Sequence, residues 1–174
     1  MSSYRRLRLR GATYFFTVAL ADRRSGVLVA EIEHLRAAFS ATRAEQMFSC
    51  DAVVVLPDHL HTVWTLPPGD SDFSLRWRKI KARFSRTVGG HYPRSWSKAR
   101  KRETGLWQRR FWEHAIRDEA DYRAHVAYCW NNPVKHGYVA HAAEWPYSSI
   151  HRDVRLGRVD PEWCKTVQDG AFGE

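Results

Sequence analysis

The segment Val53-Val54-Val55-Leu56-Pro57-Asp58-His59-Leu60-His61-Thr62-Val63-Trp64 decides how the middle of the chain folds. Two apolar, β-branched runs flank a Pro-Asp turn, which favours an antiparallel hairpin with strands at about 49–56 and 60–66. Side chains at i and i+2 of a strand point to one face, so the imidazoles of His59 and His61 project together. Such a pair can hold a divalent metal, although an isolated His-x-His is more often two ordinary polar residues.

The segments on either side of this hairpin alternate between strand and helix patterns. We expect strands at 12–20 and 106–116, and helices at about 30–46, from a cap at Ser71 or Asp72 to Val88, and at 119–131. The last helix is expected to end before Pro133, because a residue that precedes proline disfavours helical geometry. The resulting βαββαβ order is that of the ferredoxin-like α+β fold, an antiparallel sheet with helices on one face.

The length of 174 residues predicts a single domain, with a core at about 12–137 and a C-terminal extension at about 138–174 that forms short helices and loops. Three widely spaced cysteines, Cys50, Cys129 and Cys164, match neither a disulfide framework nor a zinc motif and suit a reducing cytoplasm. No segment approaches the ~20 apolar residues of a membrane span, and the N-terminus does not resemble a signal peptide.

The charge of the chain favours a polyanionic partner. The net charge is +9, and 8 Trp, 7 Tyr and 8 Phe accompany it, a combination that suits single-stranded nucleic acid. The segment 76–110 alone holds thirteen Lys and Arg against Glu103, the one acid. A solvated helix face with a basic loop at 91–105 is the alternative. The candidate DNA-contacting residues are Arg5, Arg6, Arg8, Arg10, Arg76, Lys79, Arg83, Arg86, Arg109, Arg110 and Lys135.

The helix expected at 119–131 could complete a site with the two histidines. His125, Tyr128 and Asn132 are spaced three and four residues apart and therefore share one face. The hydroxyl of Tyr128 could act as a nucleophile, and Asn132 could offer an oxygen to a metal. The alternatives are a core tyrosine, a helix-capping asparagine and a surface histidine, and Tyr122 is a rival nucleophile.

Several blocks of the chain together resemble the REP-associated tyrosine transposases, a branch of the single-tyrosine HUH (His-hydrophobic-His) transposases. The matching segments are 4–11, 13–18, 54–61, 64–67, 107–108 together with 110–117 (Arg-Phe-Trp-Glu-His-Ala-Ile-Arg), and 121–137, which includes Asn132-Pro133-Val134-Lys135-His136-Gly137. The last three blocks together are far more specific than a lone His-x-His.

The resemblance implies a role for each residue of the site. His59 and His61 match the two metal-binding histidines of the family, Tyr128 its nucleophile, and Asn132 the third metal ligand. Family members cut single-stranded DNA at hairpin-forming repetitive extragenic palindromes (REP). Two features depart from the family pattern: Cys129-Trp130-Asn131 between the tyrosine and Asn132, and the basic loop at 91–104.

These observations predict a metal-dependent transposase that cleaves and rejoins single-stranded DNA hairpins through a 5′-phosphotyrosine. Mixed imidazole and amide ligation suits Mg²⁺ or Mn²⁺, whereas histidines alone could also take Zn²⁺. His114 and His125 are possible supporting residues, with structural roles as the alternative. We expect a cytoplasmic, nucleoid-associated monomer or homodimer. The alternative functions are a DNA-nicking replication initiator and a non-catalytic nucleic-acid-binding module.

Overall fold

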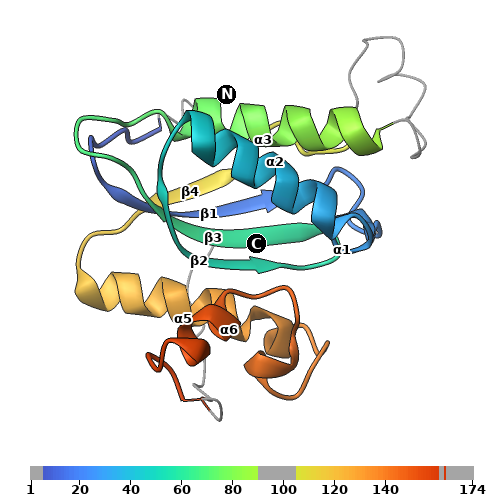
Figure 1. The fold of residues 1–174 in the computed structure, drawn as a ribbon, viewed down its shortest axis with the longest axis vertical. Coiled ribbons are helices and arrows are strands. Elements are labelled where there is room, and N and C mark those ends of the chain that lie inside the picture. The colour runs from blue at the N-terminus through green and yellow to red at the C-terminus, as the bar shows by residue number, and fades with distance from the viewer. Residues whose placement is uncertain (1–5, 90–104, 161–162, 164–174) are drawn as a thin grey trace, which may run out of the picture.

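A four-stranded antiparallel sheet forms the centre of the molecule (Figure 1). The structure is a computed structural model that describes residues 6–89, 105–160 and 163. The strands are β1 (Thr13–Ala19), β2 (Ser49–Val55), β3 (His59–Thr65) and β4 (Trp112–Ala115), and their order in the sheet is β2-β3-β1-β4. This is the strand order and pairing of the ferredoxin-like fold, so the predicted α+β class is confirmed.

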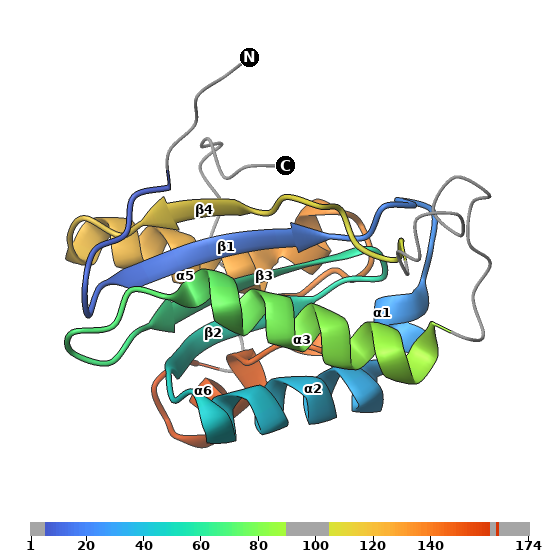
Figure 2. The same cartoon turned by 90° about the horizontal axis from the view of Figure 1, so that it is seen from above.

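Helices cover both faces of the sheet, as Figures 1 and 2 show. One face carries α1 (Val27–Ala30), α2 (Ile32–Glu45) and α3 (Phe73–Val88), and the other carries α5 (Glu119–Lys135). The short elements η1 (Ala142–Glu144) and α6 (Ile150–Arg155) lie beside α5. The two helices of the βαββαβ unit thus share one face, and the further helix that follows the fourth strand covers the other. Along the described ranges, no helix is both long and apolar enough to span a membrane.

The two faces of the sheet arise from the two-residue period of the strands. In β1, Tyr14 and Phe16 pack under α2 and α3, whereas Phe15 packs under α5. In β3, Leu60 and Trp64 belong to the α2–α3 core, whereas Val63, on the other face of the strand, packs in the cluster under α5. The hairpin between β2 and β3 closes with a hydrogen bond of 2.8 Å from the Leu56 N–H to the His59 carbonyl, in agreement with the predicted Pro-Asp turn.

The helix α5 is longer than the sequence predicts, because it continues through Pro133 to Lys135. Proline has no N–H, so the carbonyl of Cys129 loses its usual helical partner, yet the helix continues past Pro133. The helix ends in a Schellman motif instead. The N–H of Tyr138 donates to the carbonyl of Pro133, and the N–H of Gly137 donates to the carbonyl of Val134, both at 2.9 Å. The helix therefore includes four residues beyond the predicted end, 132–135, and these extend the face that carries Asn132.

The strand β4 is shorter than the expected 106–116, because regular pairing with β1 covers only Trp112–Ala115. Upstream of it, Trp107 forms an isolated bridge with Leu20. The basic loop predicted at 91–104 lies outside the described residues.

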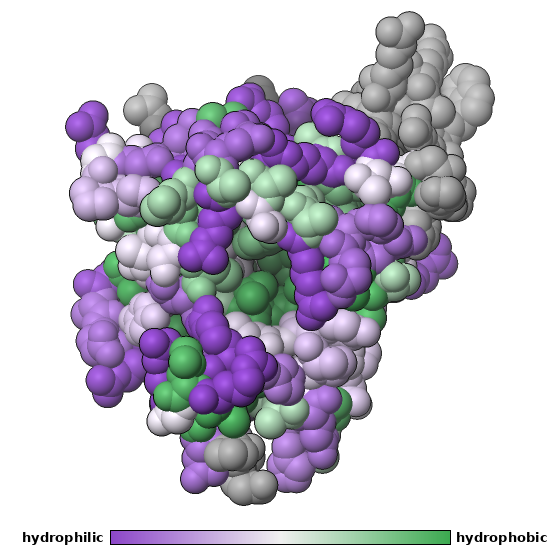
Figure 3. Space-filling view, in the orientation of Figure 1, coloured by the Kyte–Doolittle hydropathy of each residue, from purple (hydrophilic) through white to green (hydrophobic). Residues whose placement is uncertain are grey.

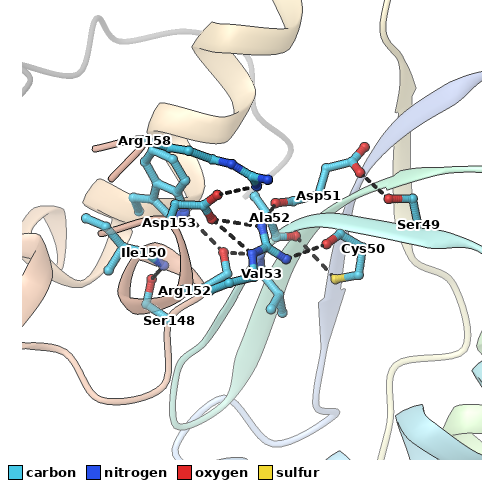
Figure 4. Close-up of polar contacts among 12 residues, drawn as sticks. Ser49, Cys50, Asp51, Ala52, Val53, Ser148, Ile150, Arg152, Asp153 and Arg158 are labelled. Carbon is cyan, nitrogen blue, oxygen red and sulfur yellow. Dashed lines mark hydrogen bonds and ion pairs between the residues drawn. The ribbon is translucent and has the colours of Figure 1, made fainter. Parts of the chain in front are cut away.

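The C-terminal segment covers the outer edge of β2. Tyr147 accepts a hydrogen bond from the N–H of Val55, and the N–H of Ser149 donates to the carbonyl of Val53. The guanidinium of Arg152 donates to the carbonyls of Cys50 and Asp51 in Figure 4. Between this segment and α2, Figure 3 shows a hollow with an apolar floor, a pocket of about 380 Å³. The extension therefore satisfies backbone groups at the edge of β2 that a further strand would otherwise pair with.

Candidate metal and tyrosine site

The two histidines of the HUH motif lie buried at the start of β3, on the face that α5 covers. His59 is 2% exposed and His61 is 0% exposed, and their ring centroids lie 4.9 Å apart at an interplanar angle of 84°. The i, i+2 spacing places both rings on one face of the strand, as the sequence predicts. The near-perpendicular rings converge on one region beneath α5.

Each imidazole is oriented by a hydrogen bond through Nδ1. The Nδ1 of His61 lies 2.9 Å from the hydroxyl of Thr17 on the neighbouring strand β1. The Nδ1 of His59 lies 2.8 Å from the carboxylate of Asp58, which also receives a hydrogen bond from Arg23. A proton on each Nδ1 leaves the lone pair on Nε2, the arrangement in which metal-binding histidines are held by a second layer of residues.

The electrostatics of this corner keep His59 neutral and Asp58 ionised. Burial lowers the pKa of His59, against the opposing effect of the Asp58 carboxylate. Burial alone would raise the pKa of Asp58, but hydrogen bonds from His59 and Arg23 outweigh it and hold that pKa below its usual value. A neutral imidazole beside a carboxylate is the protonation state that a metal ligand requires.

The donor set of the site fits a divalent metal. The Nε2 of His59 is buried and makes no hydrogen bond with any residue that the structure describes. An orphaned buried nitrogen is costly unless a ligand or metal satisfies it. Asn132 on α5 is 1% exposed, and its side-chain amide offers an oxygen, a donor type that divalent metals accept.

Helix α5 brings Tyr128 and Asn132 to the two histidines. The ring of Tyr128 lies 5.2 Å from the ring of His61, and the ring of His136 lies 5.3 Å from that of His59. Asn132 is one helical turn after Tyr128 and one turn before His136, so it lies between these two contacts on the same helix face.

Tyr128 itself is 1% exposed, and the ammonium of Lys135 lies over it. The Nζ of Lys135 is 3.4 Å from the Tyr128 hydroxyl and 5.2 Å from the ring centroid. The rival Tyr122 is half-buried and lines a different pocket, between α5 and the C-terminal segment. Its pKa is raised by burial and by nearby carboxylates.

Sequence reasoning missed the residues that orient the rings of His59 and His61. Thr17 and Asp58 hold the two Nδ1 atoms, and His136 contacts the ring of His59. Asp58 directly precedes His59 in the sequence, so its contact with that imidazole could have been predicted. Thr17 depends on the register between β1 and β3, which the sequence does not state.

The two possible supporting histidines lie together, away from His59 and His61. The rings of His114 and His125 stack 4.7 Å apart, and both side chains contact the carboxylate of Asp121. His125 is buried, so the alternative of a surface histidine is wrong. The ring of Phe15 lies between the two groups, 4.8 Å from His125 and 5.5 Å from His61.

Three of the candidate DNA-contacting residues form ion pairs with acidic residues of the protein itself. Arg76 is 2% exposed, forms a 2.6 Å ion pair with Asp70 and donates to the carbonyl of Met47. Lys79 and Arg83 both pair with Glu45 on α2. The guanidinium of Arg76 is therefore a core group and is not available for phosphate.

The other candidates lie on the surface or along the N-terminal arm. Arg6 stacks on Phe111 at 3.9 Å and donates to Ser74, which fixes the described part of the arm against α3 and β4. Arg5 lies outside the described residues. The exposed members of the set are Arg8, Arg10, Arg86, Arg109, Arg110 and Lys135.

Known proteins share this architecture along the whole chain. No protein-family model matches. The REP-associated tyrosine transposase of Escherichia coli strain K12 is 45% identical over 174 residues, which cover 100% of this chain and 98% of that protein. A relative from Haemophilus influenzae is 42% identical over 165 residues, covering 94% and 93% of the two chains. A solved structure of a REP-associated tyrosine transposase bound to a REP hairpin matches with a TM-score of 0.90 and 45% identity, over 100% of this chain and 98% of that one. The chain therefore belongs to the REP-associated tyrosine transposase family.

Proposed function

We propose that this transposase cleaves and rejoins single-stranded DNA by transesterification, with Tyr128 as the nucleophile. The observation that carries the proposal is the contact of Tyr128 with His61, which sets a phenol beside two buried imidazoles and the amide of Asn132. A phenol beside metal-ligand side chains is suited to attack on a phosphodiester.

In the proposed reaction, the Tyr128 oxygen forms a bond to phosphorus and the bond from phosphorus to the 3′-oxygen breaks. The phenol loses its proton, and the departing 3′-oxygen gains one. The products are a 5′-phosphotyrosine and a free 3′-hydroxyl. The covalent link conserves the phosphodiester energy, so a 3′-hydroxyl can reverse the step and join strands.

We propose that His59, His61 and Asn132 hold the metal. Two imidazoles with an amide oxygen suit Mg²⁺ or Mn²⁺, with positions left for phosphate and water. A divalent metal bound there withdraws electron density from the scissile phosphate and stabilises the leaving oxygen. Thr17 and Asp58 contact the Nδ1 atom of each ring, so Nε2 would be the atom of each imidazole that binds a metal.

Lys135 is proposed to act on both Tyr128 and the DNA. Its ammonium lies 3.4 Å from the hydroxyl, where it can donate a hydrogen bond to the phenol oxygen. Because Tyr128 is buried and Lys135 is exposed, an incoming phosphate meets the lysine first. The ammonium of Lys135 can then move from the tyrosine hydroxyl to the phosphate, which makes the tyrosine accessible.

The proposed substrate is a REP-type DNA hairpin, as in the solved structure of the relative. The proposed contacts with the DNA backbone are exposed basic residues of the arm, of the end of α3 and of the segment before β4, namely Arg8, Arg10, Arg86, Arg109 and Arg110. Contacts of this kind give affinity that falls with salt and little sequence preference.

The test is incubation of the chain with a single-stranded REP hairpin and Mn²⁺, followed by denaturing electrophoresis. We expect a covalent protein–DNA adduct in the wild type and none in Tyr128→Phe. Tyr122→Phe is the matched control, because it removes the same hydroxyl from the same helix and should keep the adduct.

The other outcomes separate the alternatives. Loss of the adduct in Tyr122→Phe with retention in Tyr128→Phe would transfer the nucleophile to Tyr122. Tight hairpin binding without an adduct, under Mg²⁺, Mn²⁺ and Zn²⁺, would contradict the reaction and support a non-catalytic binding module. Nicking without strand joining would support an initiator-type enzyme.

A further inference from the structure

A second cluster of metal-ligating side chains lies at the junction of β4 and α5. His114 belongs to β4, where it pairs with Phe15, and Asp121 and His125 are one turn apart at the start of α5. One ligand atom from each of the three lies within 4.8 Å of the others. The Nε2 of His114 is 2.8 Å and the Nδ1 of His125 is 3.0 Å from the Asp121 carboxylate.

We propose that His114, Asp121 and His125 form a second binding site for a divalent cation of the Zn²⁺ class, separate from the HUH site. Two imidazole nitrogens with one carboxylate oxygen are a frequent ligand set for Zn²⁺, at bond lengths of about 2.0–2.2 Å. Ligand atoms on such a centre lie roughly 3–3.5 Å apart, so the present 2.8–3.0 Å contacts require small shifts only. The third pair, the two imidazoles, must approach each other to share the ion.

The three side chains are held in place before any cation arrives. The ring of His114 lies between the parallel rings of Trp112, 5.9 Å away at 6°, and His125, 4.7 Å away at 15°. Phe15 packs on the other side of His125 at 4.8 Å. Side chains that packing already fixes lose little further freedom when they bind a ligand.

Two of the three groups are held in the protonation state that binds metal. Burial lowers the pKa of His125, so its imidazole is neutral at pH 7. Burial alone would raise the pKa of Asp121, but hydrogen bonds from His114 and Arg117 bring it down to about 2. A neutral imidazole and an ionised carboxylate are both competent ligands.

The remaining contacts of the cluster define what a cation must displace. The backbone N–H and the Nε of Arg117 donate to Asp121 at 3.0 and 3.2 Å, and the Nδ1 of His125 also lies 2.8 Å from the Asp121 carbonyl. The Arg117 side chain is 76% exposed, so its guanidinium can swing into solvent while its backbone N–H continues to orient the carboxylate. Removal of this guanidinium should therefore strengthen cation binding.

A cation here would join β4 to the first turn of α5, one turn before Tyr128. It would hold the tyrosine helix against the sheet without touching the DNA chemistry. The inference concerns metal binding by the free protein, so it does not depend on the proposed transesterification.

The test is a Co²⁺ titration followed by visible absorption and calorimetry, with Zn²⁺ as competitor. We expect two equivalents in the wild type and one in the His59→Ala/His61→Ala variant. In that background, His125→Gln or Asp121→Asn should weaken the remaining binding at least tenfold, and Arg117→Ala should strengthen it. His34→Gln, an exposed histidine on α2, is the matched control and should change nothing. Circular dichroism verifies that each variant is folded.

A second measurement uses the Tm of the same proteins. Zn²⁺ should raise the Tm of His59→Ala/His61→Ala, and this rise should vanish when His125→Gln or Asp121→Asn is added. Absence of any bound Co²⁺ in His59→Ala/His61→Ala would overturn the proposal and leave the cluster as a hydrogen-bonded brace. Binding that survives in both triple variants, or that His34→Gln removes, would also overturn it.

Discussion

The two faces of the central sheet use the same strands for different purposes. The face under α2 and α3 is filled with aromatic rings, such as Trp64 and Trp77, which stack 4.3 Å apart. The face under α5 holds the buried polar residues His59, His61 and Thr17 beside an apolar cluster that includes Phe15 and Val63. A single residue step along β3 separates one environment from the other.

The contrast between the two faces predicts different effects of substitution on each. Burial of apolar area is the main favourable term in folding, and the α2–α3 face supplies much of it. Buried polar groups stabilise little on balance and persist where a site needs them. We therefore expect substitutions on the α2–α3 face to change the free energy of unfolding and substitutions on the α5 face to change metal and DNA chemistry.

Substitution of Trp77 by alanine should give the largest effect. Trp77 is 1% exposed and packs on Trp64, Phe16 and Phe39. Its loss should lower the free energy of unfolding by about 3–5 kcal/mol. Urea denaturation measures this, with Met47→Ala, an exposed apolar position, as the control within ~0.5 kcal/mol. A change below 1 kcal/mol in Trp77→Ala would contradict the assignment of stability to this face.

Substitution of Thr17 by valine should change metal affinity more than it changes the free energy of unfolding. It removes the hydroxyl bonded to the Nδ1 of His61 while keeping the shape of the side chain. We expect metal affinity to fall about 10–100-fold, with roughly 1 kcal/mol lost in unfolding. A Mn²⁺ titration in the Asp121→Asn background isolates the HUH site. The matched control is Thr13→Val on the same strand, whose hydroxyl bonds Thr65 and should leave the affinity unchanged.

The faces of the sheet could be predicted from the sequence because they follow local periods. The alternation in β1 and β3 and the Pro-Asp turn place Phe16 opposite α3 and both histidines on the other face. The helical spacing likewise aligns Tyr128 with Asn132. Their convergence with the histidines rested on the family resemblance, because no local pattern determines which face of a sheet a later helix covers.

The residues that sequence reasoning misplaced depend on contacts made elsewhere in the chain. Arg76 has the spacing of a solvated helix face, yet its guanidinium bonds backbone carbonyls at the end of α2, Gln46 and Met47. Pro133 favours an end to the helix at the preceding residue, but α5 continues to Lys135 and ends in the Schellman motif. These outcomes reflect the register of packed elements, which a single sequence does not state.

Substitution of Arg152 by alanine tests a third kind of contact, the cover on the β2 edge. The change removes hydrogen bonds to the carbonyls of Cys50 and Asp51 and the ion pair with Asp153 (Figure 4). Because the side chain is 38% exposed, we expect a loss of about 1.5 kcal/mol in urea unfolding. Arg155→Ala, an exposed arginine on the same helix, should stay within ~0.5 kcal/mol. Equal effects in the two variants would show that the cover does not depend on Arg152.

Substitution of Gly137 by alanine tests how α5 ends. Gly137 has φ +71°, and a Cβ built there meets no atom within 4 Å. The cost is therefore conformational, about 1–2 kcal/mol for an L-residue in the left-handed region. Gly26→Ala is the matched control, since its φ is −100° and its Cβ also meets nothing, so it should be neutral or slightly stabilising. Asparagine tolerates the left-handed region, so Gly137→Asn should recover part of the loss. A neutral Gly137→Ala would show that the Schellman turn is not needed to hold the helix end that carries Asn132 and Lys135.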